Sequence, residues 1–106
     1  MYGYRWEWRW CVLRPGSLWY FKDMEGHEKK GEINILRTTR AISFKTLGAP
    51  GDAIKHRAEK PCGFTLDVDP AAGKDRHLFY FDAGSDEVLR AWTNAVYMIA
   101  KGEVGA

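Results

Sequence analysis

The spacing of apolar residues changes once along the chain, near residue 85, and this change limits the folds that the chain can adopt. Before residue 85, short runs rich in aromatic and β-branched residues alternate with glycine- and proline-containing turns, which is typical of strands. After residue 85, apolar residues recur at intervals of three and four, which is typical of one amphipathic helix. A chain of 106 residues can bury one modest core. We therefore expect a single domain over residues 1–106, with strands first and a helix last.

The strands are expected between about residue 6 and residue 82. Six segments have the composition of strands, namely residues 6–14, 18–22, 31–36, 41–45, 63–68 and 76–82. The sequence Pro-Gly-Ser at residues 15–17 indicates a tight hairpin between the first two. Residues 23–30 and 69–75 are expected to be loops. Residues 47–61 contain two prolines and two glycines, which predicts an exposed and poorly ordered insertion.

The helix is expected over residues 85–101. Ser85 is a suitable N-cap, acidic residues follow it in the first turn, and Gly102 is a typical stop signal. The apolar stripe of this helix consists of Val88, Leu89, Trp92, Ala95, Val96 and Ile99. An antiparallel sheet followed by an amphipathic helix implies an α+β fold, mainly β, in which the helix covers the open end or edge of a curled barrel or sandwich.

Composition argues against several classes of function. The net charge of +2 is too small for a typical nucleic-acid-binding protein, which carries a concentrated basic stripe. No apolar run approaches the roughly 20 residues of a membrane-spanning helix, and the N-terminus has no apolar signal segment. We therefore expect a cytoplasmic protein whose contact with membranes, if it has any, is peripheral.

The sequence contains no recognisable catalytic or metal-binding pattern. Cys11 and Cys62 each lie in an apolar run, which favours buried reduced thiols and leaves a single bridge between them open. Asp67 and Asp69 form a D-x-D pattern that lacks the further ligands of a calcium loop, so a role in the hairpin turn is favoured over a cation site. We expect no enzyme activity, no metal and no cofactor.

The ordered set of these segments resembles the pleckstrin homology (PH) domain family over nearly the whole chain. The matching segments are RWCVLR at 9–14, GSLWYFK at 16–22, GEINI at 31–35, CGFTL at 62–66, HLFYF at 77–81 and SDEVLRAW at 85–92. Trp92 stands at the family's signature tryptophan and is expected to fill the core. The resemblance implies a curled antiparallel barrel or sandwich of six to seven strands, capped by the C-terminal helix. The family's first strand is expected to be short or missing, with residues 2–4 as a candidate remnant.

The resemblance also implies inositol-phosphate headgroups as ligands, because convergent basic side chains bind phosphates through charge-assisted hydrogen bonds. Arg9, Tyr20 and Lys30 match a second-strand arginine, a third-strand tyrosine and a basic residue near the fourth strand. The first-strand lysine has no match, and Glu7 replaces a basic residue of the family pattern. Further basic candidates for weak, unselective attraction to an anionic membrane are Arg5, Lys22, Lys29 and Lys45. A plain solvated face is an equally good interpretation of these charges.

Three tryptophans near the N-terminus recur at every second position and are therefore expected on one face of a strand. Packing is the favoured interpretation for Trp8 and Trp10. For Trp6 the sequence leaves open packing, insertion at a membrane interface, and insertion into a partner's pocket.

Two functions follow from this interpretation. The first is a non-catalytic signalling module that targets a larger protein to anionic phosphoinositide membranes, at their cytosolic face and with low selectivity. The second is a protein-interaction module of an adaptor or regulatory kind, which is indicated by Glu7, the incomplete first strand and the surplus of aromatic residues. We expect a monomer, and association through an unpaired sheet edge is a third hypothesis.

Overall fold

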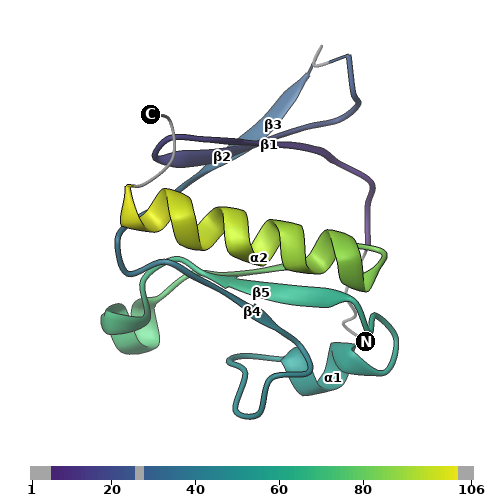
Figure 1. The fold of residues 1–106 in the computed structure, drawn as a ribbon, viewed down its shortest axis with the longest axis vertical. Coiled ribbons are helices and arrows are strands. Elements are labelled where there is room, and N and C mark those ends of the chain that lie inside the picture. Colours follow the sequence, from purple (N-terminus) through teal and green to yellow (C-terminus); the bar gives the residue numbers. More distant parts are fainter. Residues whose placement is uncertain (1–5, 26–27, 103–106) are drawn as a thin grey trace.

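The computed structural model describes residues 6–25 and 28–102, which form two three-stranded antiparallel sheets and a long C-terminal helix (Figure 1). The first sheet contains, in spatial order, β1 (Trp10–Arg14), β2 (Ser17–Phe21) and β3 (Lys29–Asn34). The second sheet contains β4 (Arg40–Ser43), β5 (Gly63–Asp67) and β6 (Leu78–Asp82). Helix α2 (Asp86–Lys101) follows β6. This architecture confirms the expected α+β fold, mainly β.

A tight hairpin joins β1 to β2, as the sequence predicts. Arg14 and Ser17 are register partners, and Gly16 between them has a φ of 84°, a left-handed conformation that glycine adopts without steric cost. Strand β1 begins at Trp10, so the strand predicted over residues 6–14 is too long at its start. The candidate remnant of a first strand, residues 2–4, lies outside the described residues.

The core lies between the two sheets and α2. Leu18 and Ile33 from the first sheet, Leu66 from β5, and Val96 and Ile99 from α2 are buried together. Figure 1 shows α2 lying across the gap between the sheets. The helix therefore closes the sandwich in the way that its apolar stripe predicts.

Both ends of α2 lie where the sequence predicts them. The Ser85 hydroxyl accepts a hydrogen bond from the backbone N–H of Val88, and Gly102 ends the helix with a φ of 77°. Trp92 is partly buried against the core, in agreement with the role expected of it. Val88 is 41% exposed, so the apolar stripe is narrower in the first turn than its sequence pattern indicates.

The connection between β4 and β5 differs most from expectation. Within residues 47–61, helix α1 (Ala53–Arg57) forms and buries His56. The His56 ring centroid lies 5.7 Å from that of Phe44 and 4.9 Å from that of Tyr80. The expected exposed and poorly ordered insertion is therefore wrong for this part, which packs on the outer face of the second sheet. Its two glycines and two prolines favour an irregular segment, whereas the residues that it packs against lie elsewhere in the sequence.

Candidate binding surfaces

The register of the first sheet brings four of the predicted basic residues to one end. Trp10 pairs with Phe21, and Phe21 pairs with Lys29, so the start of β1, the end of β2 and the start of β3 lie side by side. The basic residues at this place, which we name the basic end, are Arg9, Lys22, Lys29 and Lys30. Arg5 lies outside the described residues.

Carboxylates lie beside three of these four cations. The ion pairs are Arg9 with Glu7 at 2.6 Å, Lys29 with Glu32 at 2.7 Å and Lys30 with Glu28 at 3.1 Å. Exposed pairs of this kind stabilise a fold very little, but each carboxylate competes with an incoming phosphate for its cation. The carboxylates on the described parts of the same segments are Glu7, Asp23, Glu25, Glu28 and Glu32. Five carboxylates against four cations leave the basic end without a positive excess among the described residues.

Tyr20 belongs to the inner side of the first sheet. It packs against the core, and its ring lies over its register partner Gly31 so closely that a Cβ at Gly31 would collide with the Tyr20 hydroxyl. The closeness of the two residues explains why this position of β3 suits glycine. Tyr20 therefore points away from Lys29 and Lys30 on the neighbouring strand and toward a pocket that it shares with Arg9.

That pocket has a volume of about 520 Å³ and lies where β1 and the segment before it approach β6. Its apolar part includes Cys11, Tyr20, Ile33, Phe79 and Phe81. Its charged part holds Arg9 with Glu7 and Lys60 with Asp82, whose Nζ and Oδ2 atoms are 3.8 Å apart. Lys60 follows α1 in the chain, and no sequence pattern singled it out. Two cations and two carboxylates around apolar side chains suit an apolar group better than a phosphate.

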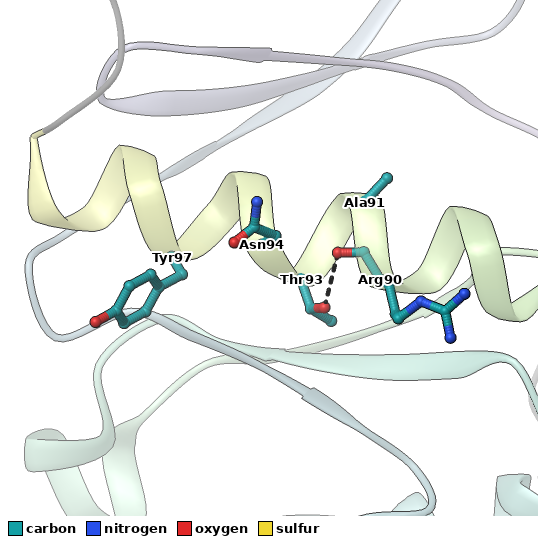
Figure 2. A pocket seen from close by; sticks show the side chains of 5 residues that line it. All are labelled: Arg90, Ala91, Thr93, Asn94 and Tyr97. Atoms are coloured by element: carbon teal, nitrogen blue, oxygen red, sulfur yellow. Dashed lines mark hydrogen bonds between the residues drawn. The ribbon is translucent and has the colours of Figure 1, made fainter.

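A shallower hollow lies on α2 and is shown in Figure 2. It is lined by Arg90, Ala91, Thr93, Asn94 and Tyr97. The Thr93 hydroxyl donates a 3.2 Å hydrogen bond to the backbone oxygen of Arg90, so this polar group is used within the helix. Because all five residues come from one helix, their side chains line an open surface and do not converge on a ligand.

The outer face of the first sheet carries an aromatic surface that the sequence interpretation did not single out. Cys11 on β1 and Leu18 on β2 face the core, and so do the residues two positions further along each of these strands. The residues in between therefore point outward. These outward residues, which we name the aromatic face, are Trp10, Val12, Trp19 and Phe21. The Trp19 and Phe21 ring centroids are 6.3 Å apart, and the Trp19 Nε1–H donates to the Ser17 hydroxyl at 2.9 Å.

Two cations lie against the indole of Trp19. The Lys29 Nζ is 3.6 Å from the ring centroid and the Arg14 Cζ is 4.6 Å from it, both within the range of a cation–π interaction. Lys29, a predicted headgroup ligand, is thus held between this ring and the carboxylate of Glu32. The aromatic face consequently combines apolar area with fixed positive groups at its centre.

The three N-terminal tryptophans do not share one face of a strand, as the sequence predicts that they would. Trp6 packs edge-on against His56, with ring centroids 5.4 Å apart. Trp8 is 94% exposed and Trp10 is 48% exposed, so packing is the wrong interpretation for these two. Residues 6–9 precede β1, where the alternation of a strand does not apply, and Trp10 lies on the outer face of its sheet. Trp6, whose role the sequence leaves open, is therefore the tryptophan that packs.

The D-x-D pattern divides into two separate roles. The carboxylate of Asp69 accepts hydrogen bonds from the Ala71 N–H and the Thr38 hydroxyl, consistent with the expected role in the turn. Asp67 is buried in β5, and its Oδ2 lies 3.7 Å from Arg76 Nε. Burial raises the pKa of Asp67, while the positive charge of Arg76 acts in the opposite direction. The described residues contain no group of three or more side chains that could hold a metal ion.

Both cysteines are free thiols and are half-buried. Desolvation raises the pKa of Cys11, and it raises the pKa of Cys62 together with a 3.5 Å hydrogen bond from its Sγ to Asp86 Oδ1. The thiolate is the nucleophilic form of cysteine, so these surroundings disfavour nucleophilic reactivity at either position.

Two small antiparallel sheets closed by a C-terminal helix define a mainly β sandwich that is capped by one helix. The family model of the PH domain matches residues 2–101, and the chain belongs to this family. PH domains are generally non-catalytic modules of signalling and targeting, and they commonly bind phosphoinositides or proteins. A search of curated proteins found no match to the chain. Among the described helices, none has the length and apolar character needed to cross a membrane.

Proposed function

We propose that this PH domain is a protein-interaction module whose aromatic face docks onto a partner protein. The observation that carries the proposal is the placement of three aromatic side chains on one sheet face that no described element covers. Trp10 is 48% exposed there, and Trp19 and Phe21 are partly exposed. Tryptophan is enriched among the residues that dominate binding energy at protein interfaces. The free energy of an aromatic surface of this kind is lower when it is buried against another protein than when it is exposed to water.

The charges on the aromatic face indicate the chemistry of the partner. The Arg14 guanidinium lies over the Trp19 ring, at the centre of the face, and no ion pair to a carboxylate is found for it among the described residues, whereas Lys29 on the same ring is paired with Glu32. An interface that covers Trp19 also removes water from Arg14. The partner surface is therefore expected to combine apolar side chains with a carboxylate that faces Arg14, because a buried cation requires a partner.

A capture experiment with matched variants tests this function. Three forms of the domain are immobilised, namely the wild type, Phe21→Ser on the aromatic face and Val88→Ser on α2. The proteins that bind to each form are quantified by mass spectrometry. Both replaced residues are apolar and at least partly exposed, but Val88 lies far from the first sheet in the chain and on another element. The proposal expects a defined set of proteins that Val88→Ser retains and Phe21→Ser loses. Equal retention of that set by Phe21→Ser contradicts the proposal.

Weak contact with anionic phosphoinositide membranes is a second function, favoured by the gathering of four cations at the basic end. The residues proposed to contribute are Arg9, Tyr20, Lys22, Lys29, Lys30 and Arg5. The carboxylates beside Arg9, Lys29 and Lys30 limit the attraction, so this contact is expected to be unselective and strongly dependent on salt. It would assist a protein interaction at the cytosolic face of a membrane.

A further inference from the structure

The connection from β3 to β4 is a turn that hydrogen bonds fix in place, at the opposite end of β3 from the basic end. Thr39 is buried, and its hydroxyl donates a 2.6 Å hydrogen bond to the backbone oxygen of Val68 and accepts one of 2.8 Å from the Leu36 N–H. The Thr38 hydroxyl donates to the carboxylate of Asp69 at 3.0 Å. Two of these three bonds tie the turn to the segment that follows β5.

This turn carries two arginines, Arg37 and Arg40, and residues 34–40 contain no acidic residue. Both arginines are exposed, and neither forms an ion pair with a carboxylate of residues 6–25 or 28–102. At the basic end, by contrast, three of the four cations are paired. An anionic ligand therefore meets less competition for its cations at the turn than at the basic end.

Backbone oxygens of the turn hold one nitrogen of the Arg40 guanidinium. Arg40 Nη1 donates to the backbone oxygens of Arg37 and Thr39, each at 2.9 Å. An arginine has five N–H donors, so Nε and Nη2 carry three that no described residue accepts. The planar guanidinium binds a carboxylate through two parallel hydrogen bonds, and the Nε and Nη2 side of Arg40 supplies the donors for such a pair.

The carboxylates that adjoin the turn are engaged with other groups. Asp67 is the register partner of Arg40, but it is only 2% exposed and its Oδ2 lies 3.7 Å from the Nε of Arg76. Asp69 accepts the hydrogen bond of the Thr38 hydroxyl. Neither carboxylate neutralises the arginines of the turn through an ion pair.

The turn continues the aromatic face. Arg14 and Asn34 are both register partners of Ser17, so the three residues form the last row of the first sheet. Leu36 follows two positions after Asn34 and is 42% exposed, and Arg37 comes next. In Figure 1 the turn between β1 and β2 and the connection from β3 to β4 lie at the same end of the molecule.

We propose that Arg37 and Arg40 bind the carboxylates of an acidic segment in the protein whose apolar part covers the aromatic face. The inference rests on the proposed function for the kind of partner, because the continuity of the two surfaces favours a single protein ligand over a lipid headgroup. Arg14 lies between them and extends the row of cations toward Trp19. An acidic segment matches this row in charge, and each guanidinium suits a carboxylate in shape.

A nuclear magnetic resonance titration of the ¹⁵N-labelled domain with a hexaglutamate peptide tests this site in about 20 mM salt, where surface charges are little screened. Weak binding is expected, with a dissociation constant on the order of 1 mM. The largest changes in amide chemical shift are expected within residues 36–40. Changes concentrated at the basic end, or no change up to about 5 mM peptide, overturn the proposal.

Matched variants separate this site from the overall charge of the domain. The double variant Arg37→Gln, Arg40→Gln is expected to bind the peptide about fivefold more weakly or worse, because it loses two charge-assisted contacts. The control is Arg57→Gln, Arg90→Gln, which removes the same charge from exposed arginines on α1 and α2 and is expected to change binding less than about twofold. Near-ultraviolet circular dichroism verifies that both variants are folded. Equal weakening in the two variants overturns the proposal.

Vesicles that contain about 30 mol% phosphatidylserine distinguish a lipid ligand from a protein segment. Vesicle binding that requires Arg37 and Arg40, together with no binding of hexaglutamate, assigns the turn to membranes and overturns the proposal. Hexaglutamate has no apolar side chain, so its failure to bind counts against the acidic segment alone. The capture experiment with Phe21→Ser tests the aromatic face separately.

Discussion

Trp6 and His56 meet edge to face, with their ring centroids 5.4 Å apart and an angle of 83° between the ring planes. This contact ties the segment before β1 to helix α1, which belongs to the other sheet's insertion. His56 in turn packs against Phe44 and Tyr80. A small aromatic cluster therefore fills the space between the insertion and the second sheet, separate from the main core.

The cluster predicts different consequences for two neighbouring tryptophans. Trp6→Ala is expected to lower the free energy of unfolding by about 2 kcal/mol, because a half-buried indole is lost from an aromatic contact. Trp8→Ala, at a position that is 94% exposed, is expected to change it by no more than about 0.5 kcal/mol. Urea denaturation followed by circular dichroism measures both. Equal effects of the two substitutions would contradict the assignment of Trp6 to the cluster.

The close approach of Tyr20 to Gly31 predicts a coupled pair of substitutions. Gly31→Ala is expected to destabilise the domain by about 1–3 kcal/mol, since the added methyl collides with the Tyr20 ring. In a Tyr20→Leu background the same substitution is expected to be less harmful, because the group that it meets is gone. A double-mutant cycle from chemical denaturation measures this coupling. Strictly additive effects would show that the contact is not the reason for glycine at this position.

The buried carboxyl of Asp67 predicts a dependence of stability on pH. Its pKa in the folded state is raised, chiefly by burial, so folding is penalised above the raised pKa and the penalty disappears as the pH falls below the ordinary value of about 3.9. Asp67→Asn is therefore expected to stabilise the domain at neutral pH, with an advantage over wild type that shrinks toward pH 4.

Thermal unfolding between pH 4 and pH 7 measures this advantage, with Asp75→Asn at an exposed position as the control. The control is expected to follow the wild type at every pH. Destabilisation by Asp67→Asn at neutral pH would show that the attraction of Arg76 outweighs the cost of burial.

Local patterns were sufficient to predict most of the fold. The hairpin at Pro15 and Gly16, the cap at Ser85 and the stop at Gly102 each depend on residues close together in the chain, and the structure has all of them. The insertion differs from expectation because the partners of His56 lie just after β4, in β6 and before β1, and nothing local to α1 reveals them. Long-range aromatic contacts of this kind have no sequence period.

The candidate surfaces were harder to predict for the same reason. The sequence identifies the basic residues that lie at the end of the first sheet. It does not reveal the ion pairs of Lys29 with Glu32 and of Lys30 with Glu28, because these depend on side-chain placement. Likewise, the alternation that places Trp19 outward becomes informative only when the register shows which face the core occupies. Glu7 is the one residue whose departure from the family pattern indicates, from the sequence alone, that carboxylates balance the cations of the basic end.

The central claim is that the basic end is balanced by its own carboxylates, so that binding depends on the aromatic face. Co-sedimentation with vesicles that contain about 5 mol% phosphoinositide, in about 0.15 M salt, tests it most directly. The expected result is weak binding that differs by less than about twofold between wild type and the Arg9→Ala, Lys30→Ala double variant. Strong binding that requires the phosphoinositide and is lost in the double variant would contradict the account.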